Sequence, residues 1–151
     1  MSQENPIRLF IAHLYAVDDD YLRVFEYLES QTNFFYKNLS TPDQLPQKHD
    51  RESLKEGLRQ QMADAEAVVL PAGLYARDPV LTEFQAIYAK SWDKPVILLE
   101  PFGTGEPIPG KLLELADEVV QWNSREMTAA IRRQARHEET TRWDTIEFKL
   151  D

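Results

Sequence analysis

Blocks of apolar residues alternate along this chain with segments of mixed polarity. The apolar blocks at 7–12, 33–39, 67–70, 96–99 and 118–122 have the length of β-strands. The segments between them repeat apolar residues at helical spacing, as Leu54, Leu58 and Met62 do at every fourth position. Strands that alternate with helices form a parallel sheet with helices on both faces. The pattern therefore predicts a doubly wound α/β fold with about five parallel strands.

The segment from Ala65 to Pro101 is the most informative, because one predicted helix, 82–92, lies between two apolar strands. The helix follows an Asp78-Pro79 break and carries Glu83 near its start. Ligands of open α/β sheets bind beyond the carboxyl ends of the strands. Glu83 is therefore a candidate reacting group, although an acid near a helix start also favours the helix dipole.

The remaining helices have recognisable start signals. The aspartates at 18–20 precede an amphipathic segment and are interpreted as capping acids rather than metal ligands. A second helix is predicted over 53–65, and Ser124 is predicted to cap a last helix that ends at about Arg136. Residues 1–136 thus form one domain, and residues 137–151 form a C-terminal extension. Within that extension, 143–150 fits either an edge strand or a flexible tail.

Composition narrows the class of protein. The chain has 151 residues and no cysteine, which excludes a thiol nucleophile, a disulfide and a Cys-based zinc site. The three histidines are far apart in sequence, so no metal is expected. A net charge of −9 disfavours nucleic-acid binding. No apolar segment is long enough to span a membrane and no leader is recognised, so we expect a cytoplasmic protein.

The familiar catalytic motifs are missing. The sequence has no Gly-x-Ser-x-Gly elbow, and the glycine-containing loop at 101–109 lacks the Lys-Ser/Thr that completes a phosphate-binding loop. A lone carboxylate near strand ends remains, together with aromatic and hydroxyl side chains. A carboxylate can bind ribose hydroxyls and stabilise an oxocarbenium-like centre, and rings such as Tyr36 and Tyr75 can stack on a base or simply pack. Cleavage of a glycosidic bond is the chemistry that fits these groups.

Four blocks of the sequence carry a resemblance to a known family. They are IRLFIAH, FFYKNLSTP, the long block from LKEGLRQQ to VILLEPFG, and ADEVVQWNSREMTAAIR. Together they resemble the TIR-like domains of bacteria and archaea, small stand-alone proteins that include the TIR component of Thoeris antiphage systems. The similarity covers about residues 7–136. It implies a flavodoxin-like sheet of five strands.

For active members, the resemblance implies cleavage of the nicotinamide–ribose bond of NAD, with cyclisation of the ADP-ribose product in the Thoeris case. NAD is then a substrate, and no cofactor is expected. Glu83 occupies the position of the family's catalytic glutamate. Ala12-His13 and the segment Lys37, Asn38, Leu39 and Ser40 match the parts of the family that line the NAD cleft. The resemblance also implies self-association and an effector protein that responds to the nucleotide product.

Two alternatives stay open. Relatives often have a serine where this chain has Ala12 and a tryptophan before the catalytic helix where this chain has Asp78-Pro79-Val80. These differences motivate the alternative of a non-catalytic TIR interaction or scaffold module. Nucleoside deoxyribosyltransferases also place a glutamate on a helix ahead of a Lys-Pro-Val segment. An enzyme of that kind is the second alternative, although the Asp and Gly-Thr that usually precede the glutamate are absent here.

Overall fold

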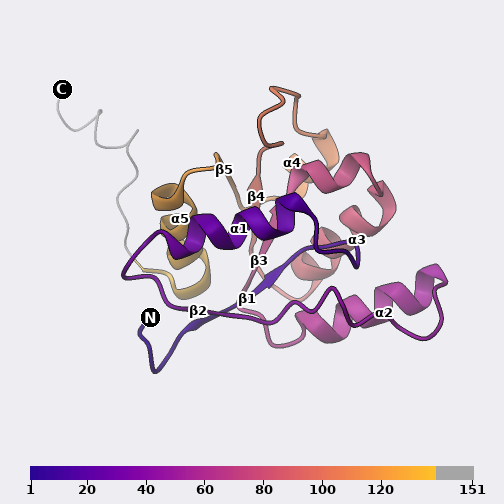
Figure 1. Ribbon diagram of the computed structural model, residues 1–151, viewed down its shortest axis with the longest axis horizontal. Coiled ribbons are helices and arrows are strands. Elements are labelled where there is room, and N and C mark those ends of the chain that lie inside the picture. Colours follow the sequence, from indigo (N-terminus) through magenta and orange to yellow (C-terminus); the bar gives the residue numbers. More distant parts are fainter. Residues whose placement is uncertain (139–151) are drawn as a thin grey trace.

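Within residues 1–138, a five-stranded, all-parallel sheet forms the centre of the fold (Figure 1). The computed structural model describes residues 1–138, so the predicted C-terminal strand or tail at 143–150 lies outside the described residues. The strand order is β2-β1-β3-β4-β5, which is the flavodoxin-like order. The predicted α/β class, the parallel sheet and the five strands are confirmed.

Strands and helices alternate along the whole described chain. The strands are β1 (Ile7–Ile11), β2 (Tyr36–Asn38), β3 (Ala67–Pro71), β4 (Val96–Leu99) and β5 (Glu118–Val120). The helices are α1 (Asp19–Glu29), α2 (Arg51–Met62), the short 3-10 helix η1 (Ala72–Ala76), α3 (Pro79–Ser91), α4 (Gly110–Leu115) and α5 (Ser124–Arg136).

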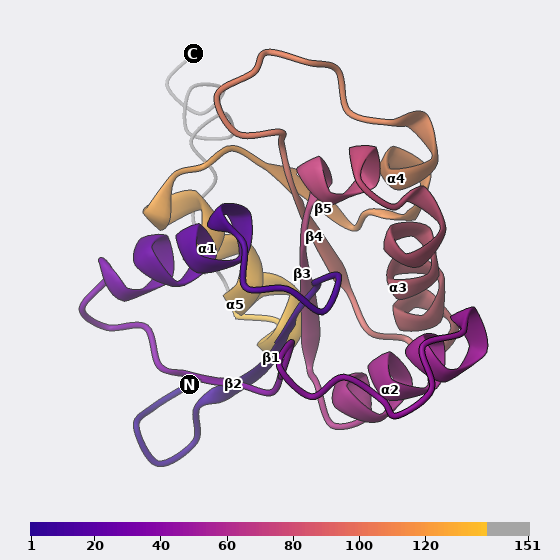
Figure 2. The same ribbon diagram turned by 45° about the vertical axis from the view of Figure 1, so that its right-hand side comes forward.

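Two apolar layers hold helices against the two faces of the sheet. Helices α1 and α5 cover one face, and α2, α3 and α4 cover the other (Figure 2). Along β1, Leu9 packs in the α1/α5 layer while Phe10 packs in the other layer, because successive side chains of a strand point to opposite faces. Both side chains are fully buried. Burial on both faces explains why the central strands are nearly all apolar.

The structure corrects several predicted boundaries. Helix α3 begins three residues earlier than predicted, because the carboxylate of Asp78 caps it and Pro79 occupies its first turn. The second strand has three residues instead of seven. Asn123, rather than Ser124, caps α5 by accepting a hydrogen bond from the Glu126 backbone N–H. Helix η1 was not predicted, because its sequence AGLYA is apolar and has no polar cap.

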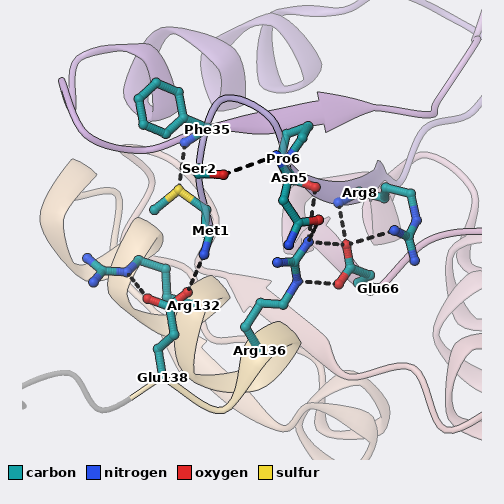
Figure 3. Close-up of polar contacts among 10 residues, drawn as sticks. All are labelled: Met1, Ser2, Asn5, Pro6, Arg8, Phe35, Glu66, Arg132, Arg136 and Glu138. Atoms are coloured by element: carbon teal, nitrogen blue, oxygen red, sulfur yellow. Dashed lines mark hydrogen bonds and ion pairs between the residues drawn. The ribbon is translucent and has the colours of Figure 1, made fainter.

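A cluster of charged side chains lies at the edge of the sheet where strands β1 and β3 begin (Figure 3). The carboxylate of Glu66, just before β3, accepts hydrogen bonds from the Arg136 side chain at 2.5 and 3.0 Å and from the Arg8 backbone N–H at 2.9 Å. Burial raises the pKa of Glu66, but these bonds outweigh it and the net shift is downward. The contacts fasten α5 to the start of β3, at the edge opposite to the one where ligands of such folds bind.

Candidate functional site

The candidate site lies at the carboxyl edge of the sheet, between β1 and β3. From β1 the chain runs to α1 on one face, and from β3 it runs to α3 on the other. The two connections therefore diverge at this point, which is where ligands bind in open α/β sheets. Three segments surround it, which we name the 12–18 loop, the 39–50 loop and the 72–78 segment.

His13 is fully buried at the end of β1. Its Nδ1 accepts a hydrogen bond from the Tyr15 backbone N–H at 3.0 Å, so the proton of the neutral ring is on Nε2. Nε2 then donates to Oε1 of Gln61 at 2.8 Å. Burial lowers the pKa of His13, and the Gln61 bond and the charge of Asp18 offset this only in part. The histidine is therefore held as a neutral ring with both nitrogens engaged.

Two glutamines fix the backbone around His13. Gln85 of α3 accepts from the His13 N–H at 3.1 Å and donates to the His13 carbonyl at 2.9 Å. Gln61 of α2 accepts from the Thr41 N–H at 2.9 Å and donates to the Thr41 carbonyl at 3.1 Å. The end of β1 is thus joined to α2, to α3 and to the 39–50 loop. Sequence reasoning missed both glutamines, because an isolated polar residue on a helix has the pattern of a solvated position.

A second cluster of hydrogen-bonded polar side chains lies at the end of β2. The hydroxyl of Tyr21, on α1, lies 2.8 Å from the Ser40 hydroxyl and accepts from the Asn38 amide at 3.2 Å. Tyr21 also packs edge-on against the His13 ring, with 6.2 Å between the ring centroids. The structure therefore brings His13, Asn38 and Ser40 together through Tyr21. The sequence signal of Tyr21 is only that of an apolar helix position.

The other residues of the predicted cleft are placed differently. Tyr36 lies at the start of β2, where it packs beside Phe25 and donates a hydrogen bond to Glu29 at 2.9 Å. Burial is the main cause that raises its pKa, with the Glu29 contact adding to it. Lys37 is exposed on the edge strand, Ala12 is buried directly after β1, and Tyr75 is half-buried in η1.

Glu83 lies on a different flank of α3 from Gln85. Its carboxylate forms an ion pair with Lys111 of α4, with 3.8 Å between Nζ and Oε1. The Glu83 side chain is 22% exposed and that of Lys111 is 71% exposed. The polar contacts of Glu83 and those of His13 thus involve different helices, α4 for the first and α2 and α3 for the second. Glu83 is therefore separate from the group that His13, Asn38 and Ser40 form around Tyr21.

Ion pairs tie the start of α3 to its neighbours. Arg77 pairs with Asp18, the residue that caps α1, and Arg51 of α2 donates to the carboxylate of Asp78 at 2.9 Å. The hydrogen bonds to Asp78 lower its pKa despite its partial burial, which acts in the opposite direction. These bonds set the position of the first turns of α3, and with them the position of Glu83.

A groove opens between the 39–50 loop and α2. Its volume is about 680 Å³, and Leu39, Pro46, Gln60 and Gln61 are among the residues that line it. Gln61 is the link to His13, so the groove and the buried histidine share one side chain. Of the predicted cleft segment, Leu39 lines this groove.

Comparison with known proteins adds no family to this description. No protein-family model matches the chain, and no curated protein matches it either. Within residues 1–138, no group of histidine and carboxylate side chains is arranged to hold a metal ion. None of the helices described in that range is both long and apolar enough to cross a bilayer.

Proposed function

We propose that this protein cleaves the nicotinamide–ribose bond of NAD, or of a related nucleotide, with Glu83 as the reacting group. The observation that supports the proposal is the place and state of the Glu83 carboxylate. It lies in the second turn of the helix that follows β3, is partly exposed, and is paired at 3.8 Å with a lysine that is itself mostly exposed. Such a pair is weak, so the carboxylate can exchange it for ribose hydroxyls.

The proposed chemistry uses the negative charge of Glu83. The bond between C1′ and the nicotinamide nitrogen breaks, and its electron pair leaves with the neutral nicotinamide. Positive charge then develops on the ribose as an oxocarbenium-like centre, which a nearby carboxylate stabilises. Water captures C1′ to give ADP-ribose and a proton, or an adenine nitrogen captures it to give a cyclic isomer. Lys111, once released from Glu83, is a cation that the pyrophosphate attracts. A cyclic product would suit a signal to an effector protein.

The test is incubation of the purified protein with NAD, with the products separated by chromatography and identified by mass spectrometry. We expect nicotinamide together with ADP-ribose or a cyclic isomer. Glu83→Gln is expected to lower turnover at least about 100-fold, because the amide carries no charge. Glu114→Gln, an exposed acid on α4, is the matched control and is expected to keep full turnover. Equal turnover in the two variants would exclude Glu83 as the reacting group.

A non-catalytic interaction module is the second candidate, and a specific observation favours it. Large apolar side chains are exposed on the neighbouring helices α3 and α4 and directly after α3. Val80 is 49% exposed, Ile87 51%, Leu113 47% and Trp92 64%. Large exposed apolar side chains on two neighbouring helices favour a surface that binds another protein, including a second copy.

Sedimentation over a range of protein concentrations tests this candidate. Ile87→Glu is expected to shift the protein toward monomer, because it places a charge within the apolar surface. Leu22→Glu is the matched control, since Leu22 is 48% exposed on α1, which covers the opposite face of the sheet. A protein that stays monomeric at every concentration would contradict self-association through this surface, and intact NAD in the same samples would count against the proposed cleavage.

A further inference from the structure

The groove between the 39–50 loop and α2 has the features of a ligand site separate from Glu83. Its volume of about 680 Å³ lies within the range of small-molecule sites in proteins. One wall is the loop, with Thr41, Gln44 and Gln47, and the other is α2, with Ser53 and Gln60. Gly57 of α2 lines it as well.

The chemistry of the lining selects neutral groups that both donate and accept hydrogen bonds. Four glutamine side chains line the groove, and each carries a carbonyl acceptor and an NH₂ donor; the groups of Gln61 are already bonded to His13 and Thr41. Hydroxyl groups have the same double capacity. Leu39 and Pro46 provide saturated apolar surface, and no aromatic ring is among the lining residues. A saturated ring bearing hydroxyls matches this combination better than a flat base does.

The charged residues of the groove also favour an uncharged ligand. Lys48 is the one basic residue of its lining, against the carboxylates of Glu56 and Asp64. Glu56 is partly neutralised by Arg59 at 2.9 Å, but the lining has no concentration of positive charge that would attract a pyrophosphate. The groove therefore disfavours NAD and favours an uncharged ligand.

We propose that this groove binds a neutral, hydroxyl-rich ligand of the saccharide class, and that Gln61 transmits its occupancy to His13. Gln61 lines the groove while its Oε1 accepts from both the His13 ring and the Thr41 N–H. A ligand that moves Gln61 alters the hydrogen bond that holds His13, and His13 in turn holds the Tyr15 N–H of the 12–18 loop. This inference does not rest on the proposed NAD cleavage.

An NMR titration with three probes tests the proposal. Maltose and D-ribose are the neutral probes, and ADP-ribose carries the same kind of hydroxyls with a pyrophosphate. We expect the sugars to shift the amide signals of Gln47 and Gln60 and the Nε2–H signal of His13. ADP-ribose is expected to shift the groove signals at least about tenfold more weakly at equal concentration, because of its negative charge.

Matched variants locate the site. Gln60→Ala removes an exposed amide of the lining and is expected to weaken sugar binding about fivefold, the effect of one hydrogen bond. Gln121→Ala removes an exposed glutamine that follows β5, outside the groove, and is expected to leave binding unchanged. Glu83→Gln is also expected to bind sugar normally, so loss of NAD turnover and loss of sugar binding are separate outcomes.

Three results would overturn the proposal. One is the absence of shifts with either sugar, and another is equal binding by the Gln60→Ala and Gln121→Ala variants. The third is tighter binding of ADP-ribose than of the neutral sugars at the groove signals. Shifts of Gln60 without any change at His13 would reject the transmission through Gln61, while the binding site itself would stand.

Discussion

At the scale of single residues, the neutral state of His13 makes folding stability depend on pH. Its pKa in the folded protein lies below the ordinary value of 6.5, because burial disfavours the imidazolium form. Between those two pKa values the unfolded chain binds more protons than the folded chain does. Stability therefore rises with pH in this window and falls on acidification below 6.5, by at most about 1.4 kcal/mol per pH unit.

Urea unfolding at about pH 7.5 and about pH 5.5 measures this effect. His13→Gln removes the titrating ring and is expected to flatten the dependence between the two conditions, whatever it does to absolute stability. His49→Gln is the matched control, because His49 is exposed in the 39–50 loop, and it is expected to keep the full slope. If the His13→Gln protein shows the same slope as the parent protein, the histidine is not held neutral by the fold.

The site residues differ in how much of their role the sequence reveals. An acid near a helix start is visible from the pattern, which made Glu83 a candidate, while the resemblance to the TIR-like family pointed to His13 and supported the role of Glu83. Their surroundings were not visible, because Gln61 and Gln85 come from helices 48 and 72 residues further along. Which flank of α3 carries Glu83 depends on how that helix packs, and the sequence pattern alone does not specify this.

At the scale of elements, Gly57 is the residue that lets α2 approach the 12–18 loop. A Cβ atom at this position would lie 2.4 Å from the Tyr15 hydroxyl oxygen and 3.1 Å from Cγ of Pro46. The Tyr15 hydroxyl donates to the Leu54 carbonyl at 2.6 Å, so it cannot move without losing that bond. In an ordinary helix interior, glycine costs about 1 kcal/mol relative to alanine. Here the close contact outweighs that cost.

We therefore expect Gly57→Ala to destabilise the protein by about 1–3 kcal/mol, because it overpacks the contact with Tyr15. In a Tyr15→Phe background the clashing oxygen is gone, so the same substitution is expected to be neutral or stabilising. A double-mutant cycle by urea unfolding measures the coupling between the two positions. Gly110→Ala is the matched control, since a Cβ there meets nothing within 4 Å. Equal effects of Gly57→Ala in both backgrounds would contradict the predicted contact.

The sequence predicts a helix or strand correctly where a single physical property, such as burial on both faces of the sheet, determines its residues. The strands β3 and β4 are buried on both faces, so their apolar runs match their observed bounds to within one residue. The second strand was overestimated, because the Phe34 side chain packs in the core although it lies before the strand begins. Helix η1 was missed because it has only five residues, too few to show a helical repeat of apolar positions. Its buried side chains belong to the apolar layer on the α2, α3 and α4 face of the sheet.

At the scale of the whole molecule, stability is expected to be graded from the centre of the sheet to its edges. Strand β3 pairs on both sides and is buried throughout, whereas β2 and β5 are edge strands of three residues each. Local opening requires breaking fewer contacts at an edge. We expect amide hydrogen exchange to be slowest in β3 and fastest in β2 and β5. Exchange in β2 as slow as in β3 would contradict this gradient.

Two loop amides at the carboxyl edge of the sheet, those of Tyr15 and Thr41, are expected to be exceptions to this gradient of hydrogen exchange, because side chains accept hydrogen bonds from them. The Tyr15 N–H donates to His13 Nδ1, and the Thr41 N–H donates to Gln61. Both amides are therefore expected to exchange more slowly than their loop neighbours at neutral pH. Protonation of His13 occupies Nδ1, so the Tyr15 N–H loses its acceptor. Its protection, corrected for the intrinsic rate, should then fall on acidification while that of Thr41 falls less. Equal loss at both amides would show that the whole edge opens together, and unchanged protection would show that His13 does not control the 12–18 loop.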